Sequence, residues 1–318
     1  MLGKTIVIAL GGNALIPKGA WGTVKDQKKR IDETAEIVAQ LARKGYKVIL
    51  THGNGPQVGN LLLQQEYART VVPDMPLDVL VAETQGQIGY LLQQSIENAL
   101  RNHRMHKGVL SLVTQVVVDE YDSSFKDPSK PVGPYYMVKE ALELKKKFTL
   151  ANDAGKGYRR VVASPKPLRI VEASSIKKLA SDGFIVIACG GGGIPVIEKA
   201  GKYWGVEAVI DKDYASVLLA KEVGAELLVM LTDVEYAFIN YNARQKEPLP
   251  IRKIDAHRAS ILLGQGQFGE GSMKPKMDSG IDFVAKYKGS KAIITTPEKL
   301  FQALDGKTGT IITKERKG

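Results

Sequence analysis

The chain has 318 residues, of which 44% are hydrophobic and 25% are charged, so it can bury a large core and has the composition of an ordinary globular protein. No apolar run approaches the ~20 residues that cross a bilayer, and the first residues lack the pattern of a secretory signal. The single cysteine, Cys189, excludes an intrachain disulfide. We therefore predict a cytoplasmic protein without a membrane partner. The net charge of +11 is compatible with acidic small substrates or nucleic acid, but the lysines are spread along the chain without zinc-finger spacing or an RNA-binding strand, so nucleic acid is an unlikely partner.

The first predicted elements are a strand, a helix and a second strand. Ile6–Leu10 is a short apolar run rich in β-branched residues, which is typical of a buried strand. Apolar residues then recur at helical spacing as far as Gly45, a typical residue at the end of a helix. They are Ile31, Ala35, Val38 and Leu41. Lys47–Thr51 is the next predicted strand.

The rest of the chain continues this alternation. We predict a helix over Leu77–Arg101 and a strand over Val109–Val118. The later predicted strands are Phe184–Ala188, Glu226–Leu231, Lys291–Thr295 and Thr310–Thr313. Thr296 and Pro297 have the residue types that begin a helix, which would follow the third of these strands. Near-continuous apolar strands separated by helices predict an α/β fold with an open, mainly parallel sheet covered on both faces.

One segment interrupts the alternation. Residues 119–167 are rich in Pro, Gly, Lys and Tyr, with a possible helix from Met137 to Phe148. We interpret this segment as a small subdomain or lid that protrudes from the sheet; the alternative is a solvated excursion without a role.

Three predicted strands end in glycine-rich loops. These loops are Gly11-Gly12-Asn13, Gly53-Asn54-Gly55-Pro56 and Gly190-Gly191-Gly192-Gly193. Because parallel strands end on the same edge of a sheet, the loops should converge there. Glycine allows backbone N–H groups to approach a ligand closely, and successive N–H groups form anion-binding concavities. One such loop is usually only a tight turn, but three on one edge favour a phosphate site.

Two common nucleotide-binding motifs are excluded by their context. Gly306-Lys307-Thr308 lacks the first glycine of a P-loop and precedes a predicted strand, where that motif requires a helix. The run from Gly264 to Gly269 matches G-x-G-x-x-G but follows a helix-like segment, where a dinucleotide fingerprint requires a strand.

Five motifs in this order resemble the amino acid kinase superfamily and, within it, the carbamate kinase family: ALGGNAL, THGNGPQVG, ACGGGGIPV, EAVIDKDYASVLLA and EGSMKPK. The resemblance spans Thr5 to Thr313. It implies a single-domain three-layer α/β/α sandwich, with an acceptor-binding half at about 1–205, a protruding subdomain at about 119–167 and a nucleotide-binding half at about 206–318. It also implies a homodimer, Mg²⁺ bound with ATP or ADP, and no metal-binding side chains that we can assign.

The resemblance implies a set of catalytic residues, namely Lys130, Lys212, Asp213 and Lys276. The lysines would neutralise phosphate charge and Asp213 would hold them in place. Carbamate is an anion whose attacking oxygen carries no proton, so the site needs donors and cations and no general base. Without the resemblance Lys130 is an ordinary surface lysine, and Lys274 competes with Lys276 as the phosphate lysine.

The remaining implied residues bind the two substrates. The acceptor and the transferred phosphate would lie against Gly11, Gly12, Asn13, Gly53, Asn54 and Gly55. The nucleotide would contact Asp211, Thr232, Asp233, Val234, Tyr236, Gly271, Ser272 and Lys274. Asp211 could instead serve only as a helix N-cap.

The expected reaction is reversible phosphoryl transfer between ATP and carbamate, giving carbamoyl phosphate and ADP, with ATP made during arginine (deiminase-type) catabolism. One alternative is a related enzyme with another acyl or phosphate acceptor. Acetylglutamate kinases carry a lysine directly before the first glycines, whereas this chain has Ala9 and Leu10 there. The other alternative is a non-catalytic protein that senses nucleotides or binds nucleic acid.

Overall fold

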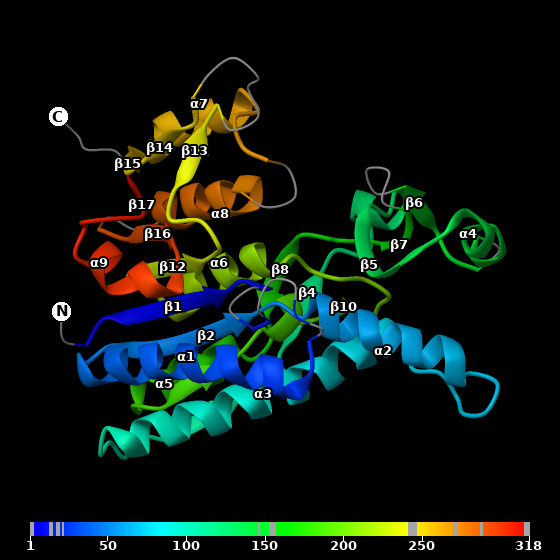
Figure 1. Ribbon diagram of the computed structural model, residues 1–318, viewed down its shortest axis with the longest axis horizontal. Helices are drawn as coiled ribbons and strands as arrows, with labels where there is room; N and C mark the ends of the chain where they lie inside the picture. The colour runs from blue at the N-terminus through cyan, green and yellow to red at the C-terminus, as the bar shows by residue number, and fades with distance from the viewer. Residues whose placement is uncertain are drawn as a thin grey trace.

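A central sheet of eight strands organises the computed structural model, which describes residues 3–12, 15–16, 20, 22–145, 147–152, 157–240, 247–269, 273–286 and 289–314 (Figure 1). The strand order is β15 (Lys253–Asp255), β17 (Thr310–Thr313), β16 (Lys291–Thr295), β12 (Leu227–Leu231), β1 (Thr5–Leu10), β2 (Lys47–His52), β9 (Ile185–Ile187) and β3 (Val109–Ser111). All neighbouring strands pair in parallel except β16 and β17, which are antiparallel. The predicted mainly parallel sheet is therefore confirmed.

Side chains of β1 point alternately to the two faces of the sheet and contribute to two layers of core packing. Val7 and Ala9 pack in the layer formed with α5 (Ala173–Ser181), α6 (Lys212–Val223) and α8 (Met273–Lys286). Ile6, Ile8 and Leu10 pack in the layer formed with α1 (Val24–Arg43), α3 (Leu77–Asn102) and α9 (Leu300–Leu304). Because successive strand side chains point to opposite faces, a strand with helices on both sides is apolar at every position. The three-layer sandwich is confirmed.

Helix α1 illustrates how the sequence sets its own boundaries. Thr23 accepts a hydrogen bond from the Asp26 N–H at 3.2 Å, and the Asp26 carboxylate accepts one from the Thr23 N–H at 3.0 Å. This reciprocal cap satisfies two N–H groups that the helix cannot pair internally. The helix ends just before Gly45, whose φ of 84° lies in the left-handed region. Both the face and the end of this helix were predicted correctly.

A second sheet extends one end of the first. Its order is β11 (Lys202–Gly205), β10 (Ile194–Lys199), β4 (Gln115–Val118) and β8 (Pro167–Ile170). The single strand predicted over 109–118 is wrong, because the chain leaves the central sheet after β3 and enters the second sheet at β4. Thr114 lies at this transition, where its buried N–H donates to Gln85 Oε1 at 2.8 Å.

The interrupting segment forms a small sheet of its own. Strands β5 (Lys130–Tyr136), β7 (Tyr158–Val162) and β6 (Leu150–Asn152) pair antiparallel, preceded by the short helix η2 (Ser123–Phe125). The helix predicted over 137–148 exists as the shorter α4 (Val138–Leu144). Figure 1 shows this sheet and α4 projecting from the central sheet next to α2 (Gly55–Ala68). A Cβ added to Gly59 of α2 would lie only 3.2 Å from Gly133 Cα in β5, so glycine permits this close approach.

The remaining elements are short, and most of them lie in the last third of the chain. They are the hairpin β13 (Ala237–Ile239) and β14 (Leu249–Ile251), helix α7 (Ala256–Gly264) and the 3₁₀ turns η3 (Gly190–Gly192) and η4 (Pro297–Lys299). The helix predicted after Thr296 is present as η4 followed by α9.

Candidate active site

The N-terminus of α6 is the centre of the candidate site. Asp211 is its N-cap, and Asp211 Oδ1 accepts a hydrogen bond from the Asp213 N–H at 2.9 Å. Lys212 and Asp213 therefore occupy the first turn of α6, so their backbone is held by the helix. The N-cap interpretation of Asp211 is correct in geometry, although it is not the only contact of this residue.

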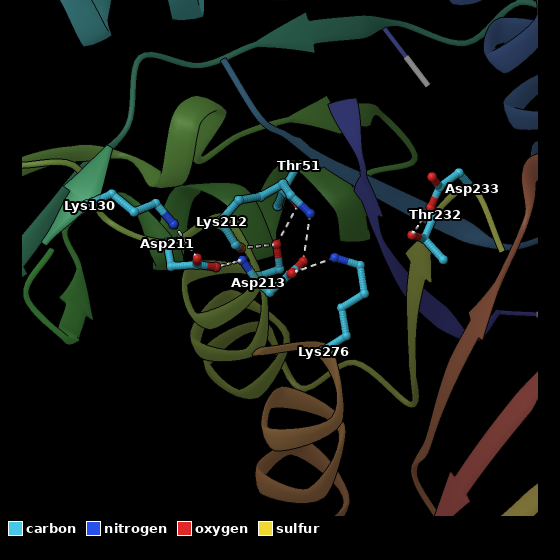
Figure 2. Close-up of polar contacts among 9 residues, drawn as sticks. Thr51, Lys130, Asp211, Lys212, Asp213, Thr232, Asp233 and Lys276 are labelled. Carbon is cyan, nitrogen blue, oxygen red and sulfur yellow. Dashed lines mark hydrogen bonds and ion pairs between the residues drawn. The ribbon is translucent and has the colours of Figure 1, made fainter. Parts of the chain in front are cut away.

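Two lysines share the Asp213 carboxylate (Figure 2). Lys212 Nζ lies 2.6 Å from Asp213 Oδ1, and Lys276 Nζ, from the first turns of α8, lies 2.9 Å from Oδ2. Their side chains are only 14% and 11% exposed, against 6% for Asp213. One carboxylate between two buried ammonium groups leaves a net positive charge, which suits a site for a phosphate anion.

Burial and charge shift the pKa values of this cluster. Burial alone would raise the pKa of Asp213, but Lys212 and Lys276 outweigh it and hold that pKa well below the ordinary 3.8. Burial lowers the pKa of Lys212 from its ordinary 10.5, although Asp213 opposes the shift. The protonation states of Asp213 and Lys212 therefore depend on each other.

A third lysine reaches the same helix end from the protruding sheet. Lys130, the first residue of β5, places Nζ 2.6 Å from Asp211 Oδ2. Asp211 thus binds a lysine with one carboxylate oxygen and caps α6 with the other. Figure 2 shows Lys130 approaching Asp211 from the side opposite Lys276.

Two of the three glycine loops lie beside this cluster. The Gly53 N–H donates to Leu10 O at 3.3 Å, and the Gly11 N–H donates to Leu231 O at 3.2 Å, so the ends of β2, β1 and β12 meet. A Cβ added to Gly53 would lie 3.8 Å from Lys212 Cδ, and a Cβ added to Gly11 would lie 2.6 Å from Leu231 O. Gly11 therefore permits a close approach that a larger residue would disturb, whereas the Gly53 distance is an ordinary contact that places Lys212 beside the second loop.

The third loop packs against His52 and Asn54, at the end of β2 and in the second loop. Its four glycines are buried, and the N–H groups of Gly192 and Gly193 donate inside the loop to Cys189 O and Gly190 O. Added Cβ atoms at Gly190 and Gly191 would lie 2.5 Å from His52 Nε2 and 2.3 Å from Asn54 Nδ2. The expectation that all three loops present amides to a ligand is therefore wrong for the Gly192 and Gly193 amides, which are used within the turn itself.

His52 and Asn54 face this buried loop. Burial lowers the pKa of His52 to about 4, so the ring is neutral at pH 7, and Nδ1 lies 2.9 Å from Gly53 O. Asn54 Nδ2 donates to Thr84 Oγ1 at 2.8 Å. The Asn54 amide group is thus directed toward α3, while Gly55 is exposed at the first residue of α2. Asn13 lies outside the described residues.

A cavity of about 370 Å³ opens next to Lys276. Its lining joins the ends of β1, β12 and β16 with one residue of α1: Gly11, Gly12, Arg30, Leu231, Thr232, Asp233, Lys276, Thr296, Pro297 and Glu298. Sequence reasoning missed Arg30 and the turn Thr296–Glu298. The turn follows a predicted strand and could have been found by the strand-end rule, whereas Arg30 lies within a helix and carries no such signal.

The other predicted nucleotide residues lie around this cavity to different extents. Thr232 Oγ1 donates to Asp233 Oδ1 at 3.2 Å at the cavity wall. Tyr236 directs its hydroxyl to Thr308 Oγ1 at 2.8 Å, and neither Tyr236 nor Val234 is among the residues that line the cavity. Lys274 is in the first turn of α8, and Gly271 and Ser272 lie outside the described residues.

The described residues contain no cluster of three or more acidic, histidine or cysteine side chains that could hold a metal ion. Asp211 and Asp213 are each bound by lysine. Both carboxylates are therefore already engaged by ammonium groups. Within the same described part of the chain, no helix has both the length and the apolar character needed to cross a membrane.

Comparison with known proteins gives matches over almost the whole chain. Residues 4–296 match the Amino acid kinase family. Carbamate kinase of Pyrococcus horikoshii is 45% identical over 314 residues, covering 98% of this chain and 99% of that protein. Carbamate kinase 2 of Enterococcus faecalis is 44% identical, with 97% and 98% covered.

Solved structures agree with the sequence matches. Carbamate kinase from Giardia lamblia bound to AMP-PNP superposes with a TM-score of 0.92 at 41% identity, covering 98% of this chain and 99% of that one. N-acetylglutamate synthase from Neisseria gonorrhoeae gives a TM-score of 0.54 at 17% identity, and it covers 98% of this chain and 62% of its own. The second likeness concerns the fold alone.

Proposed function

The chain belongs to the amino acid kinase family, and on this premise we propose that it is a carbamate kinase, which transfers a phosphoryl group reversibly between ATP and carbamate to give carbamoyl phosphate and ADP. The Lys212–Asp213–Lys276 cluster carries the proposal, because it concentrates positive charge where two glycine loops meet. The identity of 45% over nearly the whole length to a carbamate kinase supports the choice of acceptor.

The proposed roles follow from the charges. In phosphoryl transfer the enzyme mainly positions the reactants and neutralises charge on the transferred group. Lys212 and Lys276 stabilise that charge, and Asp213 fixes their separation. Lys130 closes over the acceptor from the protruding sheet. Backbone amides of Gly11, Gly12, Asn13, Gly53, Asn54 and Gly55 hold the acceptor and the phosphate.

The nucleotide is assigned to the cavity beside Lys276. Thr232 and Asp233 line it, and Lys276 connects it to the lysine cluster. We further assign Asp211, Val234, Tyr236, Gly271, Ser272 and Lys274 to its surroundings. Mg²⁺ would arrive with the phosphates and neutralise part of their charge. That a similar Giardia structure is bound to AMP-PNP supports ATP as the nucleotide.

A coupled assay tests the function. Purified protein receives ADP, Mg²⁺ and carbamoyl phosphate, and ATP formation is followed; acetyl phosphate replaces carbamoyl phosphate in a parallel reaction, and ATP with acetylglutamate forms a third. We expect ATP only from carbamoyl phosphate. Turnover with acetyl phosphate or acetylglutamate alone would favour another acceptor, and no turnover at all would favour a non-catalytic protein.

The cellular setting is also a proposal. Carbamate kinase activity in the cytoplasm would make ATP during arginine (deiminase-type) catabolism, with the enzyme as a homodimer. Sedimentation equilibrium tests the oligomeric state, since a single species of twice the chain mass is expected.

A further inference from the structure

A buried pair of hydroxyl groups joins β2 to the first turns of α6. Thr51 Oγ1 lies 2.6 Å from Ser216 Oγ, and Ser216 Oγ donates to Lys212 O at 2.7 Å. Both residues have no solvent exposure. A hydroxyl has one proton to donate, and Ser216 gives its own to the carbonyl, so Thr51 is the donor between the two. The chain of bonds therefore runs from β2 through Ser216 to the backbone of Lys212.

The end of β2 also supports the side chain of Lys212. A Cβ added to Gly53 would lie 3.8 Å from Lys212 Cδ and 3.9 Å from Cε, which shows that the aliphatic stem passes directly over this glycine. Lys212 is thus held at its carbonyl through Thr51 and Ser216, and its stem lies beside Gly53. Figure 2 shows Thr51 beside Lys212.

Core packing alone does not explain these hydroxyls. A serine that bonds the carbonyl four residues earlier is common in helices and slightly weakens them. Here a second hydroxyl comes from a strand 165 residues away, on the same face of β2 as the apolar Ile49. Replacing both partners by apolar groups of similar shape is often nearly neutral for stability. The hydroxyl pair therefore fixes the Lys212 carbonyl relative to β2, which two apolar residues would not do.

We propose that Thr51 and Ser216 are positioning residues for phosphoryl transfer, which act by fixing Lys212 relative to the β2 loop. This inference rests on the proposed carbamate kinase activity. An ammonium group that is displaced by a fraction of an ångström stabilises the transferred phosphate less well, while the nucleotide can still bind.

Three variants test the positioning role in the full-length protein. Thr51→Val and Ser216→Ala should each lower kcat about tenfold with KM for ADP changed less than about twofold, because an interaction made mainly in the transition state is weakened. Thr51→Ser keeps the hydroxyl and should retain at least half of the wild-type kcat. Ser95→Ala is the matched control, since Ser95 is also buried but donates to Asp32 Oδ1 at 2.6 Å, between α3 and α1. It should leave kcat unchanged.

Coupling to Lys212 distinguishes positioning from a general loss of structure. Adding Thr51→Val to Lys212→Ala should lower kcat no further, since the group to be positioned is gone. The inference is overturned if Thr51→Val and Ser216→Ala keep wild-type kcat, or if Thr51→Val lowers kcat tenfold in the Lys212→Ala background as well.

A second measurement does not depend on turnover. In ¹³Cε-lysine NMR spectra, with the Lys212 signal assigned from its loss in Lys212→Ala, that signal should move in Thr51→Val and Ser216→Ala but not in Thr51→Ser or Ser95→Ala. An unmoved signal in all four variants would contradict the inference even if the wild-type protein proved inactive in the assay. Absence of wild-type turnover with a moved signal would instead count against the proposed function.

Discussion

Two buried ammonium groups share one carboxylate in this protein, and each charge of this cluster depends on the others. Asp213 contacts both Lys212 and Lys276, so removing any member changes the charge felt by the others. Burial without a partner costs a charged group several kcal/mol, which makes the cluster sensitive to each of its contacts.

Lys212→Ala should lower kcat at least about a hundredfold, roughly 3 kcal/mol of transition-state stabilisation. The pH profile gives a second readout. The lysine is charged below its pKa, and burial lowers that pKa, so activity should fall with rising pH before the ordinary lysine value of 10.5 is reached. Lys212→Arg keeps its charge and should lose this alkaline decline, whatever its kcat at pH 7.

The control for this pH profile is Lys221→Arg, at an ion pair of α6 with the largely exposed Asp282. Its profile should match the wild type. An alkaline decline that persists unchanged in Lys212→Arg would contradict the assignment of this limb to Lys212.

Asp213→Asn should destabilise the fold by about 3 kcal/mol at pH 7, because two buried ammonium groups lose their counterion. The folded-state pKa of Asp213 is lowered, so its stabilising contribution is complete above the unfolded pKa of about 3.9 and decreases as the pH falls below it. Urea unfolding at pH 7 and pH 3 should therefore show a smaller difference between variant and wild type at pH 3.

Asp282→Asn provides the comparison, since its partner pair is at the surface and should change stability by less than about 1 kcal/mol. Equal unfolding midpoints for Asp213→Asn and the wild type at pH 7 would show that the carboxylate is not needed to balance the lysines.

The resemblance to a family selected the lysine and aspartate positions, and the structure brings these side chains into contact with one another. It could not locate Arg30, Thr51 or Ser216 as members of the same region. Thr51 and Ser216 look like ordinary strand and helix residues, and only the packing of α6 on β2 brings their hydroxyls together. Contacts between distant segments leave no local pattern in the chain.

At the scale of elements, the contact between α2 and β5 sets the position of the protruding sheet. Gly59 and Gly133 allow the helix and the strand to approach, and Lys130 begins the same strand three residues before Gly133. The helix that follows one glycine loop therefore also supports the lysine that reaches over the site.

Gly59→Val should move β5 away from α2, because even a Cβ at this position would lie 3.2 Å from Gly133 Cα. We expect kcat to fall about tenfold as Lys130 is displaced, and hydrogen exchange of the β5 amides to become faster. Gly86→Val is the matched helical control, since Gly86 of α3 is exposed and has no atom within 4 Å of an added Cβ. Unaltered β5 exchange in Gly59→Val would contradict this account.

Element boundaries were predicted best where a strand is apolar and ends in a turn residue. β16 and β17 match their predicted ranges, whereas 109–118 divides between two sheets. Both parts are apolar, so no hydrophobic pattern marks the break, where Thr114 pairs with Gln85 of α3. The Gly190–Gly193 loop was misread in part for a related reason, because glycine type does not reveal whether an amide is already bonded.

At the scale of the whole molecule, one sheet carries both proposed substrate sites. β1 lies between β2, which leads to the acceptor loop, and β12, which leads to the nucleotide cavity. The protruding sheet brings Lys130 to the same region, where it contacts Asp211 at the start of α6.

Lys130→Ala should lower kcat about tenfold or more while the fold remains intact, since the lysine belongs to the small sheet and contacts the body through Asp211. Lys126→Ala makes the same charge change at an exposed position of the same segment and should keep wild-type kcat. Steady-state assays of carbamoyl phosphate turnover with matched melting temperatures compare the two. Equal kcat values would remove Lys130 from the site.

The position of β1 in the centre of the sheet has a consequence for how the chain is made. Thr5 bonds Glu226, 221 residues later, and Ile6 to Leu10 pair with β12. At ribosomal speeds of about 5–20 residues per second, the first strand waits roughly 10–45 s for this neighbour. During synthesis one hydrogen-bonding edge of an apolar strand is therefore uncovered, and the nascent protein is most exposed to misassociation before its final third has emerged.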